Sequence, residues 1–135
     1  MKKIVCGLLT LLSVLCISGC TLLSDERVKL RDLDFTVLSQ EKIPEELMEI
    51  IEEKKSEPFQ LTYSDNENLY ICIGYGRQQT GGYSIAVNEL YLTDTAIYVS
   101  ASLLGPGQEE KSNQTASYPF IVIKTEYLDQ TVMFE

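Results

Sequence analysis

The chain has 135 residues, 44% of them hydrophobic, and its 11 basic and 20 acidic residues give a formal net charge of −9. This length suits one domain with a small core. The negative charge argues against binding nucleic acid, which requires neutralisation of phosphates. Histidine is absent, which excludes serine–histidine and cysteine–histidine catalysis and histidine-ligated zinc. We therefore expect a protein that is not an enzyme and needs no cofactor or metal.

The first twenty residues have the layout of a bacterial lipoprotein signal. Two lysines follow Met1, an apolar stretch runs from Ile4 to Ile17, and the small residues Ser18 and Gly19 precede Cys20. The apolar stretch has the length of a secretory signal and is short for a membrane-spanning helix. The Cys20 thiol is the expected acceptor of diacylglycerol. An ordinary signal peptide with an incidental cysteine and a short membrane anchor are the alternatives.

The signal predicts three segments and a location. We expect residues 1–19 to be a lipoprotein signal peptide, residues 20–32 a lipidated tether and residues 33–135 a β-rich domain. Cleavage before Cys20 leaves 9 basic and 20 acidic residues, a formal charge of −11. Two acyl chains anchor a protein stably, whereas one binds marginally. The expected location is outside the cytosol on the cell membrane, or on the outer membrane of a cell that has two.

The cysteines do not predict a disulfide framework. Cys6 and Cys16 leave with the signal and Cys20 carries lipid, so only Cys72 remains in the mature chain. Cys72 lies in the apolar run 69–73. We expect a buried, unreactive thiol.

Hydrophobic periodicity predicts one helix among several strands. The helix is expected to have Pro44 as its first residue and to end before Pro58, with Ile43, Leu47, Ile50 and Ile51 on one apolar face. Strands are expected at 33–38, 59–63, 69–73, 83–92, 97–103, 120–125 and 131–134, with a bulge at Asn88-Glu89. The predicted fold class is α+β: a mostly antiparallel β-sheet or small sandwich of about six strands with one amphipathic helix.

The loop from Gly76 to Gly82 is the segment that invites a chemical interpretation. It satisfies the glycine spacing of a phosphate loop, but Gly82-Tyr83 stands where lysine and serine or threonine are required. A dinucleotide fingerprint would need glycine where Gln79 stands. Glycines that allow positive φ instead predict a tight strand-to-strand connection that exposes Arg77 to Thr80. A purely structural turn is the alternative.

Three segments resemble the C-terminal domain of the PrcB family of protease-complex subunits. They are Gly-Tyr-Gly at 74–76, Thr-Gly-Gly-Tyr-Ser-Ile at 80–85, and Ser-Tyr-Pro-Phe-Ile-Val-Ile-Lys at 117–124. The likeness covers roughly residues 59–125. It implies a short secreted lipoprotein with a non-catalytic accessory role, and it brings no catalytic residues.

A weaker likeness is to small immunoglobulin-like inhibitors of cysteine proteases, which present three loops at one end of a sandwich. The segments 79–83, 105–107 and 118–120 follow the same order. The chain departs from that pattern at Gln79, which replaces an Asn-Pro start, and in having no tryptophan.

Together these observations predict a membrane-tethered binding module with an extracytoplasmic protein partner, for which a protease is the first candidate. Tyrosine, which occurs eight times, is enriched at protein interfaces and also favours strands. The predicted partner-binding residues are Arg77, Thr80, Gly81, Gly82, Tyr83, Tyr118 and Pro119. The alternatives are a loop-presenting protease inhibitor and a cell-wall ligand-binding lipoprotein.

Overall fold

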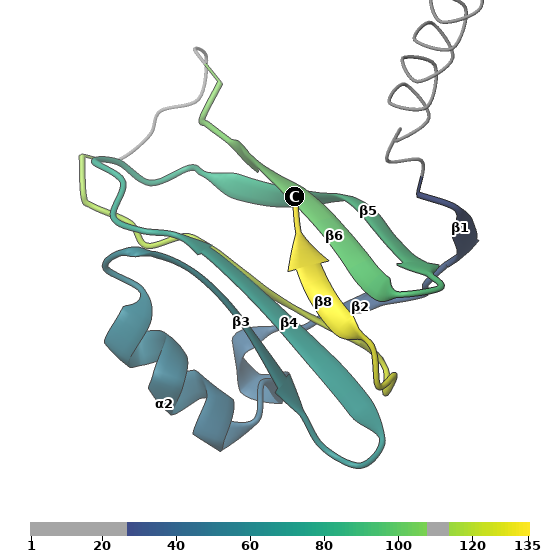
Figure 1. Cartoon of the computed structure of the whole chain (residues 1–135). Coiled ribbons are helices and arrows are strands. Elements are labelled where there is room, and N and C mark those ends of the chain that lie inside the picture. Colours follow the sequence, from purple (N-terminus) through teal and green to yellow (C-terminus); the bar gives the residue numbers. More distant parts are fainter. Residues whose placement is uncertain (1–26, 108–113) are drawn as a thin grey trace, which may run out of the picture.

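A computed structural model of the protein describes residues 27–107 and 114–135. These residues form two four-stranded β-sheets that lie face to face, with a helix against the outer side of one sheet (Figure 1). The predicted signal peptide, Cys20 and the tether up to residue 26 lie outside the described residues. Within the described part of the chain, no helix combines the length and apolarity needed to cross a bilayer.

The elements follow one another in a simple order. They are β1 (Lys29–Asp32), β2 (Thr36–Val37), the 3₁₀ helix η1 (Gln40–Lys42), α2 (Glu45–Lys54), β3 (Pro58–Ser64), β4 (Asn68–Tyr75), β5 (Ser84–Thr93), β6 (Ala96–Leu104), β7 (Phe120–Glu126) and β8 (Thr131–Phe134). The first sheet has the order β1-β5-β6-β8, and the second has the order β2-β7-β4-β3. All pairs are antiparallel except β6 with β8.

The predicted α+β class with one amphipathic helix agrees with this architecture, but the strand number was too low. The described residues contain eight strands in two sheets rather than about six. The strand that lies outside the seven predicted ranges is β1, which occupies the last four residues of the predicted tether 20–32 and pairs with β5. Its sequence Lys-Leu-Arg-Asp lacks an apolar alternation, so only pairing with β5 makes it a strand.

The segment predicted as a strand at 33–38 is instead a crossing between the sheets. The Leu33 N–H donates to the Leu90 carbonyl in the first sheet (2.9 Å), and the Leu38 N–H donates to the Val122 carbonyl in the second sheet (2.9 Å). Only Thr36–Val37 pairs as a strand, with β7. The crossing closes one side of the sandwich along part of its length.

Two apolar clusters hold the three layers together. Between the sheets, Ile71, Ile97 and Ile123 are among the fully buried side chains. On the other face of the second sheet, Leu47 and Ile51 of α2 are completely buried and pack in one cluster with Tyr70, Cys72 and Val122. Complete burial of an aliphatic side chain stabilises by about 1.5–3 kcal/mol. Because successive strand residues face opposite sides, the apolar run of β4 serves both clusters.

Local signals in the sequence set the ends of several elements. Pro44 has φ −53° and ψ 138° and precedes the first helical residue, rather than being that residue as predicted. In the β3–β4 turn, Asp65 Oδ1 accepts the N–H groups of Glu67 (2.9 Å) and Asn68 (2.7 Å). These bonds favour the charged carboxylate and lower the pKa of Asp65.

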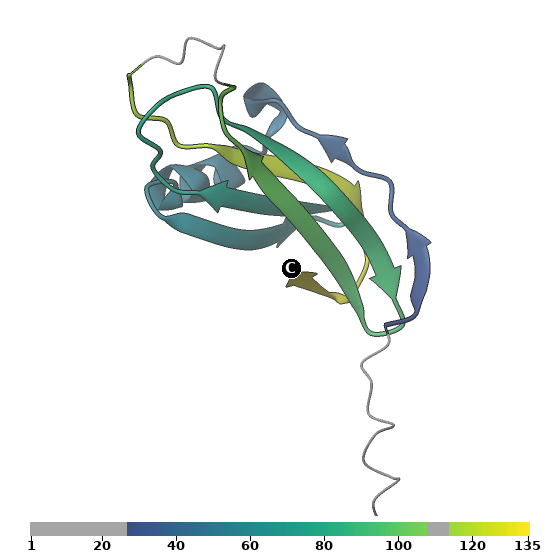
Figure 2. The ribbon, with the colours of Figure 1, turned by 90° about the horizontal axis from the view of Figure 1, so that it is seen from above.

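The β5–β6 ribbon extends beyond its neighbours in the sheet. Strand β1 and the following residue pair only with the part of β5 from Leu90 to Thr93, and β8 pairs only with Ala96–Val99 of β6. The predicted bulge is confirmed, because the β5–β6 register shifts between Val87 and Glu89. Beyond the bulge, the ribbon runs past the short outer strands toward the loop end of the molecule (Figure 2).

Candidate protein-binding site

The two long connections of the domain meet at one end of the sandwich. The β4–β5 connection, residues 76–83, and the end of the β6–β7 connection form an isolated antiparallel bridge between Gln78 and Ser117. The Gln78 N–H donates to the Ser117 carbonyl (2.8 Å), and the Ser117 N–H donates to the Gln78 carbonyl (3.0 Å). The Ser117 hydroxyl also donates to the Thr80 carbonyl (2.6 Å). Three hydrogen bonds thus fix one loop against the other.

Positive backbone angles at two glycines shape the first loop, as the sequence predicted. Gly76 has φ +74° and Gly82 has φ +86°, a region that L-residues rarely adopt. A Cβ at position 76 would lie 2.9 Å from Pro58 Cδ and 3.0 Å from the Pro58 nitrogen. A Cβ at position 82 would lie 2.9 Å from Pro106 Cβ. Glycine is therefore required at both positions, because of the positive φ and because a Cβ would collide with a proline.

The C-terminal end of α2 joins the same surface. The Arg77 N–H donates to the Ser56 carbonyl (3.3 Å), and the Lys55 ammonium lies 5.6 Å from the centre of the Tyr118 ring. The Tyr75 N–H donates to the Pro119 carbonyl (3.0 Å), which continues the contact between β4 and the second loop. The C-terminal end of α2, the end of β4 and the two loops are thus in contact at this end of the sandwich.

A small hollow opens beside the loops, between β5 and β7. Its volume is about 250 Å³, and Tyr83 and Pro119 lie in its wall. The other lining residues are Val37, Ser84, Ile85, Phe120 and Ile121. Val37 is 55% exposed, which is high for an aliphatic side chain in a strand. The hollow could hold one apolar side chain of a partner.

All seven predicted site residues lie at this loop end. Arg77, Gly82 and Tyr118 are exposed, whereas Thr80, Gly81, Tyr83 and Pro119 are partly buried. Their role in binding stays a prediction. Sequence reasoning missed Val37, Ile85 and Phe120. Their apolar alternation indicates that they belong to strands, but it does not indicate between which strands a hollow remains.

The tyrosines of the strands do not form one binding stripe. Tyr70 packs under the helix, and Tyr75 packs against the core between the sheets. Tyr91 and Tyr98 stack with ring centres 5.4 Å apart, beneath Lys29 and Arg27 respectively. Tyr83 and Tyr118 are therefore the tyrosines whose side chains contribute to the loop end, where Tyr75 contributes a backbone hydrogen bond.

Cys72 is the free cysteine of residues 27–107 and 114–135. Cys72 is completely buried, as predicted, and burial raises the pKa of its thiol to about 12. In residues 27–107 and 114–135, no group of three or more histidine, cysteine, aspartate or glutamate side chains is arranged to hold a metal ion.

Fold and site together define a class: a small two-sheet domain with one covering helix, in which two loops are hydrogen-bonded to each other at one end. The family model described as PrcB C-terminal matches residues 69–126. This match confirms the resemblance to the PrcB C-terminal domain that the sequence indicated. The match runs from within β4 to the end of β7, so it includes both converging loops. No curated protein and no solved structure matches the chain significantly.

Proposed function

We propose that the protein is an extracytoplasmic lipoprotein, anchored through lipid on Cys20, that serves as a non-catalytic accessory module for a protease complex. The observation that carries this proposal is the PrcB C-terminal match, which spans both loops of the candidate site. A PrcB domain suggests a protease-associated accessory role. The partner is then a protein that is bound at the loop end.

The geometry of the loop end supports binding to a protein surface. The bridge between Gln78 and Ser117 and the two constrained glycines hold the loops in one arrangement. A preorganised surface loses little conformational entropy when a partner binds. Tyr118, which is 36% exposed, offers the combination of rigid area and polar tip that is common at interfaces.

The position of β1 supports an outward orientation of this surface. Lys29 of β1 pairs with Thr93 beside the β5–β6 turn, whereas the loops follow the opposite end of that ribbon, at Ser84 and Leu104. A strand of the length of β5 spans about 30 Å. A lipid anchor preceding β1 would therefore hold the turn near the membrane and direct the loops away from it.

Two experiments test the anchor. Labelled palmitate should enter the parent protein in growing cells and should not enter the Cys20→Ser variant. The variant should also move from the membrane fraction to the soluble fraction. Unlabelled parent protein, or identical fractionation of parent and variant, would refute the lipid anchor.

A matched pair of tyrosines tests the binding surface. Tyr118 lies at the loop end of β4, whereas Tyr127 is 46% exposed and lies beside Glu67 at its other end. A photocrosslinking residue at position 118 should capture a partner in intact cells, and the same residue at 127 should not. Tyr83→Ala should reduce capture at 118 about tenfold or more, as expected for loss of an interface anchor. Equal capture at both positions would contradict the proposed site.

One observation favours protease inhibition as a second candidate function. The three segments that resemble inhibitor loops lie together: Gly82 and Tyr83 approach Pro106 and Gly105, and Ser117 bonds to Thr80. Titration of the purified domain against cysteine and serine proteases separates the two functions. Stoichiometric inhibition that is lost in Tyr83→Ala would favour the inhibitor, whereas capture of a protease without inhibition would favour the accessory role.

A further inference from the structure

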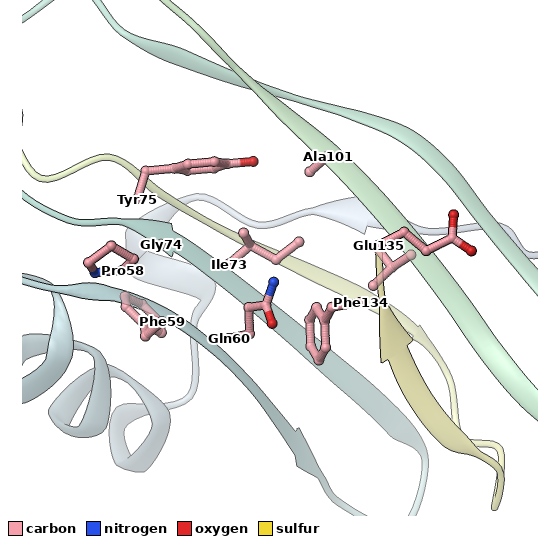
Figure 3. A pocket seen from close by; sticks show the side chains of 10 residues that line it. Pro58, Phe59, Gln60, Ile73, Gly74, Tyr75, Ala101, Phe134 and Glu135 are labelled. Carbon is pink, nitrogen blue, oxygen red and sulfur yellow. The ribbon is translucent and has the colours of Figure 1, made fainter.

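A second and larger hollow lies on the other side of the β5–β6 ribbon, between the outer strands β3 and β8. This cleft has a volume of about 480 Å³. Ile73 and Phe134 lie on its floor, Gln60 lies along the β3 side, and the Tyr75 hydroxyl points across it toward Ala101 (Figure 3). Its lining includes one carboxylate residue, Glu135, whose carboxylate pairs with Arg27 of the segment before β1.

The cleft runs beside a strand edge that has no partner in the described part of the chain. Strand β8 pairs with β6 only up to Val99, where the Glu135 N–H donates to the Val99 carbonyl (2.9 Å). The N–H and C=O groups of alternate strand residues point to the same edge. The backbone groups of Ala101 and Leu103 therefore point to the same edge of β6 as those of Val99. β8 pairs with this edge at Ala96–Val99 and does not reach Ala101 or Leu103.

This edge also lacks the features that usually prevent strand addition. The segment Ser100–Leu104 contains no charged residue and no proline, and Leu104 is 50% exposed. Outer strands of native sheets are commonly protected by charges, prolines or short length. β1, the outer strand on the opposite side of the same sheet, has three charged residues among four. Among residues 27–107 and 114–135, the edge of β6 beyond Val99 is therefore both unpaired and unprotected.

We propose that the free edge of β6 at Ser100–Leu104 takes up an extended segment of a partner protein by strand addition, with one apolar side chain of the segment filling the cleft. Backbone hydrogen bonds would supply affinity and the cleft would supply specificity. The chain carries a net charge of −9, and this overall charge sets the preference, because the one carboxylate that lines the cleft, on Glu135, is already paired with Arg27. We therefore expect the partner's segment to carry basic rather than acidic residues beside the apolar residue that fills the cleft. The same net charge opposes occupation by a second copy. The proposal does not rest on the function assigned to the loop end.

A display library of short, extended peptides provides the probe. The peptides alternate apolar and polar positions, with all charges allowed at the flanks, and they are selected on the full protein. Selection should enrich an apolar or aromatic central residue and lysine or arginine at the flanks. Binding of a recovered peptide should weaken with added salt. Failure to recover any peptide, or enrichment of acidic flanks, would overturn the proposal.

Two proline variants then locate the bound peptide. Leu103→Pro removes an N–H from the free edge of β6, whereas Val87→Pro removes an N–H from the opposite outer edge of the same ribbon. Leu103→Pro should weaken peptide binding about tenfold, as expected for loss of one hydrogen bond and added steric conflict, and Val87→Pro should leave it unchanged. Equal effects of both variants, or a larger effect of Val87→Pro, would overturn the assignment. Far-UV circular dichroism verifies that each variant folds.

Hydrogen exchange gives a readout that needs no variant. In the free protein the Ala101 and Leu103 amides should exchange faster than the Ser100 and Ser102 amides, which face β5. Adding the selected peptide should protect Ala101 and Leu103 while the Val87 amide stays unprotected. Slow exchange of Ala101 and Leu103 in the free protein, or a dimer in sedimentation that Leu103→Pro abolishes, would show that the edge is already occupied and would overturn the proposal.

Discussion

The substitution Gly82→Ala tests the link between a backbone angle and the shape of the candidate site. Gly82 has φ +86°, and a left-handed angle of this kind costs an L-residue roughly 1–2 kcal/mol. The new methyl group would also lie 2.9 Å from Pro106 Cβ, closer than ordinary van der Waals contact, so Pro106 must shift. We expect the free energy of unfolding to fall by about 2 kcal/mol. For a domain of this size that corresponds to a melting temperature lower by about 10 °C.

A double-mutant cycle separates the two causes. Urea unfolding followed by circular dichroism is measured for the parent, Gly82→Ala, Pro106→Gly and the double variant. Removing the Pro106 side chain abolishes the collision, so in that background Gly82→Ala should cost only the roughly 1–2 kcal/mol of the backbone angle. Gly76→Ala is the matched control, because its methyl group meets the Pro58 backbone nitrogen at 3.0 Å and should cost more. An unchanged unfolding midpoint for Gly82→Ala would refute this account, and a strictly additive cycle would refute the contact with Pro106.

Three further perturbations address the loop contact, the helix and the buried thiol. Ser117→Ala removes the 2.6 Å hydrogen bond to the Thr80 carbonyl and should lower the free energy of unfolding by about 1 kcal/mol. Ser117→Thr should retain the bond. An equal loss of unfolding free energy in both variants would contradict the assigned role. Leu47→Ala should lower the free energy of unfolding in urea by about 2–5 kcal/mol, because the side chain is completely buried. Glu49, which is exposed on the same helix, provides the control. A loss as small as that of Glu49→Ala would contradict the packing of α2. Burial raises the pKa of Cys72 from 9.0 to about 12, so its contribution to stability is complete below pH 9 and is lost as the pH rises toward 12. The alkaline fall in stability should be smaller in Cys72→Ala. A thiol reagent should modify Cys72 only when the parent unfolds, and rapid labelling of Cys72 in the folded protein, located by peptide mapping, would contradict this burial.

Much of the local structure could be predicted from the sequence because its causes are local. The alternation of apolar residues marked the strand regions after Pro58, and the helical spacing of Leu47 and Ile51 marked the face of α2 that is buried. A break in that alternation at Asn88 marked the bulge in β5. The need for positive φ at Gly76 and Gly82 followed from glycine itself. Each signal depends on residues that are neighbours along the chain.

Pairing between distant segments decided the rest. β1 is a strand because β5 lies beside it, although its charged sequence indicated part of a tether. β8 was expected as a strand, but its parallel pairing with β6 depends on where the chain returns after β7. The hollow beside Tyr83 and the cleft beside Ala101 exist because β1 and β8 end before β5 and β6 do. Sequence periodicity determines which face of a strand is apolar. Which edges stay unpaired depends on the length of the neighbouring strands, and only the folded chain brings those strands into register.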